Sequence, residues 1–144
     1  MKRLILFIVL IFSTASFSAD QWNTYQWNKF NETQGNGEIS KTPWYEWWYY
    51  KVVIPETGKS YYFVYGIVNP WDSSYQSRGT RSYVSAGDFT KKILFENKYP
   101  LEQFKANYFV TDILIGNNIA TDTYLKGMTS NKKGQSISWD ISIA

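Results

Sequence analysis

The chain has 144 residues, a length that suits one domain, and it contains neither cysteine nor histidine. The lack of cysteine excludes a disulfide framework and a cysteine-linked lipid anchor, and the lack of histidine excludes Ser-His-Asp triads and most catalytic zinc sites, so we expect no metal and no cofactor. Because Lys2 and Arg3 precede the first apolar run, the net charge of +3 falls to about +1 in the rest of the chain, which excludes a nucleic-acid-binding surface.

Residues 1–19 have the pattern of a secretory signal peptide. Lys2 and Arg3 are followed by the apolar run LILFIVLIF and then by the small-residue segment STASFSA. The run is too short to span a bilayer, so we expect an exported protein, periplasmic or secreted, without a membrane span after cleavage. Cleavage after Ala15 or Ser18 fits this pattern, and an uncleaved anchor is the alternative. Residues 20–42 are polar and rich in asparagine, which is typical of a lead-in segment.

Short runs of aromatic and β-branched residues recur along residues 43–144 at a spacing of roughly ten residues. They predict strands at 44–54, 60–68, 81–88, 89–96, 119–128 and 136–143. Turns are expected at 55–58 and 116–118, a tight turn or only a bulge at 87–88, and a loop at 71–80. Within residues 99–115, the helical spacing of Leu101 and Phe104 allows a helix to start, whereas the β-branched and aromatic residues at 108–115 favour a strand. This pattern predicts an all-β domain whose antiparallel sheet curls into a barrel or a sandwich. Because the best-patterned strand comes last, we expect either a fragment or a last strand that closes a barrel.

The aromatic stretch 43–70 contains most of the candidate functional residues. Alternation places Glu46 on one face of its strand with Trp48 and Tyr50, whereas Lys51 marks the other face as the wetter one. Glu46 is therefore expected to point inward among aromatic rings. The alternative is that Glu46 organises the core, by accepting hydrogen bonds from buried tyrosine or tryptophan or by pairing with an arginine such as Arg81.

The same stretch resembles the tocopherol cyclase family and the related carotenoid hydratase-like proteins of the lipocalin-like superfamily. The resemblance rests on a Glu-x-Trp-Tyr strand, EWWY at 46–49, that runs into Lys51 and ends at Ile54 and Pro55. A second aromatic strand follows and ends at Asn69 and Pro70. Weaker matches continue to residue 143: the turn at 115–117, Gly127, and the strand at 137–140.

This resemblance implies the N-terminal, lipocalin-like half of a longer protein that protonates a double bond of an isoprenoid or a prenylated hydroquinone. Cyclisation or hydration of the carbocation then follows. Such chemistry needs a carboxylic acid in an apolar setting and aromatic faces that stabilise a cation. Glu46 is the candidate general acid, and Asp88 and Asp140 are the other candidate acids. The candidate ligand-binding residues are Trp44, Trp48, Tyr50, Tyr61, Phe63 and Tyr65.

Other readings of the same residues stay open. The chain is alternatively an exported lipocalin-like protein that binds an apolar isoprenoid or lipid without turnover, or a truncated remnant without function. The aromatic residues alternatively fill the core, and Asp140 is alternatively a solvent-facing strand residue. The partner expected under both functional readings is an apolar small molecule.

Overall fold

The computed structural model describes residues 45–70, 79 and 81–143, and within these residues the chain is all-β, as predicted. The strands form two antiparallel sheets in which neighbours in sequence are neighbours in space. The first sheet contains β1 (Tyr45–Ile54), β2 (Lys59–Val68), β3 (Arg81–Asp88) and β4 (Ile93–Tyr99); the second contains β5 (Phe104–Ala106), β6 (Asp112–Ile115), β7 (Asn118–Thr121), β8 (Tyr124–Ser130) and β9 (Ser136–Ser142). The short 3-10 helix η2 (Leu101–Gln103) connects the sheets.

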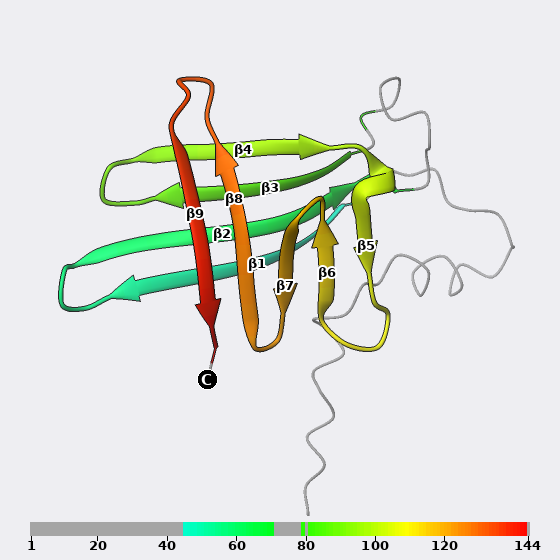
Figure 1. Ribbon diagram of the computed structural model, residues 1–144, viewed down its shortest axis with the longest axis horizontal. Helices are drawn as coiled ribbons and strands as arrows, with labels where there is room; N and C mark the ends of the chain where they lie inside the picture. The colour runs from blue at the N-terminus through cyan, green and yellow to red at the C-terminus, as the bar shows by residue number, and fades with distance from the viewer. Residues whose placement is uncertain (1–44, 71–78, 80, 144) are drawn as a thin grey trace, which may run out of the picture.

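The two sheets pack face to face, and the strands of the second cross those of the first (Figure 1). The described strands do not close into a barrel, because β1 and β4 are edges of the first sheet and β5 and β9 are edges of the second. The β1–β2 and β3–β4 hairpins extend past β9 (Figure 1). One end of the first sheet therefore lies beyond the last strand of the second.

Alternation along β1 gives this strand one inner and one outer face. Trp48 is buried on the inner face, and Glu46 and Tyr50 are half-buried on the same face. Lys51 lies on the exposed outer face. The predicted inward orientation of Glu46 is confirmed, whereas Trp44 lies outside the described residues.

Four rows of residues face one another across the inner side of β1–β4. From the end nearest the β1–β2 turn, the rows are Val52–Tyr61–Asp88–Ile93, Tyr50–Phe63–Ala86–Phe95, Trp48–Tyr65–Val84–Asn97 and Glu46–Ile67–Ser82–Tyr99. Trp139 of β9 packs on Phe63 with ring centroids 4.6 Å apart. Phe104 of β5 lies 6.3 Å from Trp48. The core thus lies between these middle rows and the second sheet, where each fully buried large side chain contributes roughly 1.5–3 kcal/mol.

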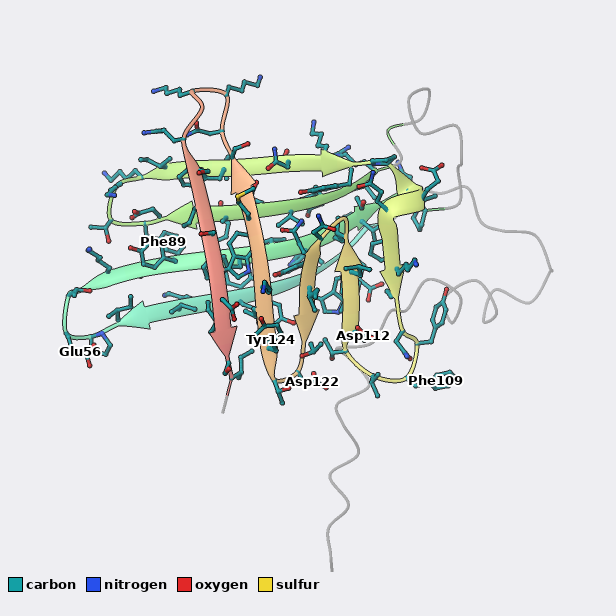
Figure 2. The ribbon with its side chains drawn as sticks, viewed as in Figure 1. Glu56, Phe89, Phe109, Asp112, Asp122 and Tyr124 are labelled. Atoms are coloured by element: carbon teal, nitrogen blue, oxygen red, sulfur yellow. The ribbon has the colours of Figure 1, made fainter. Side chains whose placement is uncertain are left out.

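The outer face of the first sheet carries further aromatic rings that remain exposed to solvent. Tyr62 stacks on Tyr49 at 5.8 Å and contacts Phe89 at 5.3 Å. Phe89 lies just after β3 (Figure 2), and Lys51 Nζ is 5.9 Å from its ring centroid, which is a cation–π distance. The prediction that Lys51 lies on the more exposed face of β1 is therefore confirmed, and aromatic residues surround it there.

The turn between β3 and β4 differs from the prediction. Gly87 and Asp88 are the last residues of β3, and the turn follows at 89–92. Asp88 Oδ1 accepts a hydrogen bond from the Lys91 N–H at 2.9 Å, and Lys92 adopts a positive φ of 55°. Aspartate holds turns by bonding to nearby backbone in this way, so no glycine is needed at the turn itself.

Residues 119–128, predicted as one strand, form parts of β7 and β8 with a tight turn between them. The Thr121 hydroxyl donates to the Tyr124 carbonyl at 3.3 Å and accepts from the Thr123 N–H at 3.3 Å, so a side chain supports a turn that lacks glycine. Residues 99–115 follow the strand alternative in β5 and β6, and η2 is the helical turn found there.

Candidate functional site

The predicted acids do not share one site. Glu46 lies in the fourth inner row of the first sheet and Asp88 in the first row. Six strand positions separate Glu46 from Val52, which shares a row with Asp88, so the two acids are about 20 Å apart along the sheet. Asp140 lies in β9 and is exposed. A compact site therefore contains Glu46 or Asp88 but not both.

Three of the predicted ligand-binding residues lie in the core. Trp48, Phe63 and Tyr65 are 5%, 3% and 0% exposed. The Tyr65 hydroxyl donates to the Lys126 carbonyl at 3.0 Å and accepts from the Trp139 indole N–H at 2.9 Å. These rings offer a ligand little surface, and core packing accounts for their positions.

Tyr50 lies beside Tyr65, with the two rings in a T-shaped contact at 6.2 Å. Burial raises the pKa of Tyr50 to about 12, and the charge of Asp122 adds to this shift. Burial also raises the pKa of Tyr65. Both phenols therefore stay neutral well into the alkaline range, which makes them hydrogen-bond donors rather than bases.

A cavity of about 590 Å³ lies between β9 and the part of the first sheet that extends past it; we call it the edge groove. Most of its lining is apolar: Val52, Ile54, Tyr61, Phe63, Ile93, Phe95, Ile137, Trp139 and Ile141. Asp88, Lys91 and Asp140 also line the groove. The structure thus brings four predicted site residues, Tyr61, Phe63, Asp88 and Asp140, to one cavity.

Asp88 is the buried acid of the edge groove, with 7% of its surface exposed. One carboxylate oxygen accepts the Lys91 N–H described above, and the other lies 3.9 Å from the Lys91 ammonium. The carboxyl group therefore acts as an acceptor that holds the β3–β4 turn. It also places a polar oxygen in the wall of a largely apolar cavity.

Asp140 belongs to a charged cluster with Tyr124 and Lys126 on the outer side of the second sheet. Its carboxylate lies 3.4 Å from the Lys126 ammonium. The pKa of Asp140 lies below its usual value, chiefly because the Tyr124 hydroxyl donates a hydrogen bond and also because the Lys126 charge is close. An acid with a lowered pKa stays ionised at neutral pH, so Asp140 is poorly suited to protonate a substrate.

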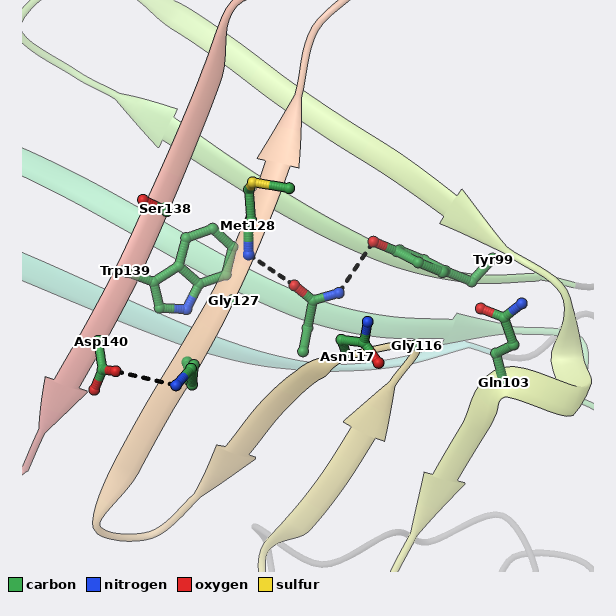
Figure 3. Close-up of a pocket in the computed structure, with 11 residues that line it drawn as sticks. Tyr99, Gln103, Gly116, Asn117, Gly127, Met128, Ser138, Trp139 and Asp140 are labelled. Carbon is green, nitrogen blue, oxygen red and sulfur yellow. Dashed lines mark hydrogen bonds and ion pairs between the residues drawn. The ribbon is translucent and has the colours of Figure 1, made fainter.

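A second cavity, of about 610 Å³, opens on the outer side of the second sheet; we call it the amide pocket (Figure 3). Its polar lining residues are Tyr99, Gln103, Asn117, Asn118, Lys126, Ser138 and Asp140, and Met128 and Trp139 supply apolar surface. The predicted set contains only Asp140 from this cavity. Tyr99 is the last residue of β4 and Gln103 the last residue of η2, and the other residues come from β7, β8, β9 and the β6–β7 turn.

Asn118 organises this pocket and was missed by sequence reasoning. It is 4% exposed, and its side-chain amide donates to the Ile115 carbonyl at 2.8 Å and to the Tyr99 hydroxyl at 3.0 Å. Its Oδ1 accepts the Met128 N–H at 2.8 Å, beyond Leu125 and Lys126, the two residues of β8 that pair with β7. The residue type could have indicated this role, because asparagine is depleted in strands and needs a specific hydrogen-bond partner when it is buried there.

Asn97 accepts hydrogen bonds at the end of β8, as Asn118 does at the middle of that strand. The Asn97 Oδ1 accepts the Ser130 N–H and the Thr129 hydroxyl, each at 2.9 Å. Within the described residues, no strand pairs with this edge of β8 beyond Lys126. The side-chain amides of Asn97 and Asn118 accept hydrogen bonds from its backbone N–H groups instead, and they fasten the second sheet to β4.

Among the residues that the structure describes, no cluster of three or more acidic residues could hold a metal ion, and no helix has the length and apolarity to cross a bilayer. Comparisons of the chain with protein-family models, with curated proteins and with solved structures found no match. The resemblance of residues 43–143 to tocopherol cyclases therefore stays a prediction.

Proposed function

We propose that this chain is an exported, lipocalin-like protein that binds an apolar ligand of isoprenoid type in the edge groove. The observation that carries the proposal is the groove itself, a cavity of about 590 Å³ with a largely aliphatic and aromatic lining drawn from both sheets. Cavities of roughly 300–1,000 Å³ with an apolar lining and few polar groups are typical of small-molecule sites.

The chemistry of the lining indicates the class of ligand. A ligand that buries roughly 300 Å² of apolar surface gains about 7 kcal/mol. Association costs at least about 4 kcal/mol, so about 3 kcal/mol remains, which corresponds to a dissociation constant in the millimolar range. The carboxylate of Asp88 in the groove wall is an acceptor for a ligand hydroxyl, which a prenylated hydroquinone would supply.

The matched pair Val52→Glu and Val53→Glu tests this proposal. Val52 lines the groove, whereas Val53, the next residue of β1, is 55% exposed on the outer face. We expect farnesol and a prenylated hydroquinone to bind the wild type and Val53→Glu equally. Val52→Glu should bind at least about tenfold more weakly, because the new carboxylate loses hydration when the ligand fills the groove.

Binding is measured by isothermal titration calorimetry, and circular dichroism checks that both variants are folded. Equal binding by a folded Val52→Glu variant would place the ligand elsewhere. Absence of binding to the wild type would make the proposed function wrong.

The second candidate is catalysis of the tocopherol cyclase type, with Glu46 as general acid. It is supported by the position of Glu46, half-buried on the inner face of β1 and two residues from buried Trp48. The Glu46 proton would add to a prenyl double bond, and the substrate's ring hydroxyl would close on the carbocation. The hydroxyl proton then returns to the carboxylate, so the product is an isomer of the substrate.

Mass spectrometry with chromatography of a prenylated hydroquinone after incubation with the full-length chain tests this candidate. Glu46→Gln should abolish product formation, whereas Asp88→Asn should retain it, because the two residues lie at opposite ends of the inner face. Full activity of Glu46→Gln, or no turnover by the wild type, rules out the assigned role.

A further inference from the structure

The amide pocket exists because β7 is shorter than β8. The two strands pair only at Ile119–Lys126 and Ala120–Leu125, and β8 continues to Ser130 without β7 beside it. The β6–β7 turn and the connection from β4 border the space that this leaves (Figure 3). The cavity therefore follows from the strand lengths and does not depend on the rotamer of one surface side chain.

The wall of the pocket is held in place before any ligand binds. Asn118 fixes the Met128 backbone, the Ile115 carbonyl and the Tyr99 hydroxyl through its buried amide. A site whose wall is already ordered loses less conformational entropy on binding.

Polar groups without partners face this wall. The side-chain amides of Gln103 and Asn117 and the hydroxyl of Ser138 line the pocket, and they have no hydrogen-bond partner among the described residues. The Tyr99 hydroxyl accepts from Asn118, so its own proton remains available to a ligand. Together these groups offer several neutral donors and acceptors to one occupant.

The charges of the pocket compensate each other. Lys126 and Asp140 form an ion pair at 3.4 Å, and no other charged side chain lines the cavity. A charged ligand would therefore find no unpaired counter-charge. Met128, 62% exposed, adds apolar surface. The Trp139 indole lies directly against Gly127, where a Cβ would clash with the ring, so the ring forms part of the pocket wall.

We propose that the amide pocket binds a neutral pyranose saccharide. Gln103, Asn117 and Tyr99 hydrogen-bond to ring hydroxyls, and Met128 packs against the apolar C–H face of the sugar. A saccharide combines a rim of hydroxyls with an apolar face, and the lining of this pocket has the same two parts. The pocket shares the β9 residues 138–140 with the edge groove, but Gln103, Asn117 and Tyr99 line the amide pocket and not the edge groove, so this proposal does not depend on the proposed isoprenoid ligand.

Amide NMR spectra of the isotope-labelled, full-length chain test the proposal during titration with maltose, cellobiose and N,N′-diacetylchitobiose up to about 10 mM, a concentration that saturates a millimolar site. At least one saccharide should cause saturable shifts of the Gln103 and Asn117 side-chain amides and of the Gly116 N–H. The edge-groove residues Val52 and Ile93 should not shift.

The variants Gln103→Ala and Asn117→Ala should each weaken this binding about two- to twelvefold, which is the loss of one neutral hydrogen bond. Both side chains are exposed, so the variants should fold as the wild type does. Gln135→Ala, which removes an exposed amide outside this pocket, is the matched control and should bind normally.

Three results would overturn the proposal: no saturable shift with any of the saccharides, shifts confined to residues outside the pocket, or unchanged affinity of both variants. Glycine and glutamate serve as charged competitors. If either shifts the same residues at lower concentration than every saccharide, the pocket binds zwitterions and the assigned ligand class is wrong.

Discussion

Replacing Asn118 with alanine should destabilise the fold far more than replacing its neighbour Asn117. The Asn118 side chain is buried and bonds to two backbone groups and one tyrosine. Alanine at this position removes all of these bonds and leaves the Met128 N–H, beside the unpaired edge of β8, without its acceptor. Asn117 is exposed, and its side chain has no partner among the described residues.

The magnitude follows from the groups left unpaired. A buried donor without an acceptor costs about 1–3 kcal/mol, and each of the other lost hydrogen bonds costs about 0.5–1.5 kcal/mol. Because the Tyr99 hydroxyl and part of the pocket can reach water, we take about 3 kcal/mol for Asn118→Ala. This is a large share of the roughly 5–15 kcal/mol that stabilises a typical domain. Asn117→Ala should stay within about 0.5 kcal/mol of the wild type.

Urea denaturation followed by tryptophan fluorescence measures the difference. With an m-value of about 1.5 kcal/mol/M, a loss of 3 kcal/mol lowers the midpoint by roughly 2 M. The reasoning is refuted if Asn118→Ala and Asn117→Ala unfold at the same urea concentration. An unchanged midpoint for both would mean that the edge of β8 needs no side-chain partner.

Three further predictions concern the core and its titration. Tyr65→Phe should cost about 1–3 kcal/mol in urea denaturation, because it leaves the buried Trp139 indole N–H without an acceptor; an unchanged midpoint contradicts this. Gly127→Ala should cost about 1–3 kcal/mol, because a Cβ there would clash with the Trp139 ring and crowd Asn118, both of which are held by hydrogen bonds; wild-type stability would show that the ring can move. The folded-state pKa of Tyr50 is about 12 against an ordinary 10.0, so its contribution to stability is complete below pH 10 and is lost as the pH rises toward 12. The urea midpoint should fall over this range, and less steeply in Tyr50→Phe; equal slopes would contradict the assignment.

The sequence predicted the first sheet best. The bounds of β1, β2 and β3 and the inward orientation of Glu46, Trp48 and Tyr50 follow from strict alternation, since a shift of one residue would reverse every side chain. The dense aromatic residues on both faces also left no helical alternative. Local pattern was therefore sufficient where each strand had one buried face.

The turn after β3 was predicted too early in the chain, because a glycine indicated it there. Gly87 was assigned to a turn, yet it lies inside β3, and the ring of Tyr62 lies across it so closely that a Cβ would clash. This glycine accommodates a neighbouring ring. The turn depends on Asp88, a residue type that favours turns, and on the positive φ of Lys92, which the lysine residue type does not indicate.

The candidate sites were harder to predict because they depend on the relative placement of the two sheets. Alternation showed that Glu46 faces inward, but only the strand register shows that Asp88 belongs to another row. The edge groove exists because the first sheet extends past β9, and the amide pocket exists because β7 is shorter than β8. Both features are differences in strand length between elements, which no local pattern encodes.

The size of the overhang leads to a last prediction about the edge groove. Trp139 of β9 lies over Phe63, and four strand positions separate Phe63 from Lys59 at the start of β2. The first sheet therefore extends about 13 Å past β9. Neighbouring strands lie about 4.8 Å apart, so this overhang would hold roughly two more strands beside β9. A ligand in this groove is elongated and lies along β9, with one side against protein and the other exposed.

Affinity should therefore rise with the length of the prenyl chain until the groove is filled. A buried methylene contributes about 0.8 kcal/mol, and roughly half of each carbon's surface meets the open groove, so one five-carbon unit contributes about 2 kcal/mol. This corresponds to a dissociation constant about thirtyfold lower. Calorimetric titrations with geraniol, farnesol and geranylgeraniol measure the trend, and Val52→Glu should flatten it. Equal affinities for the three alcohols would show that the hydroxyl group, not the apolar chain, is what the protein recognises.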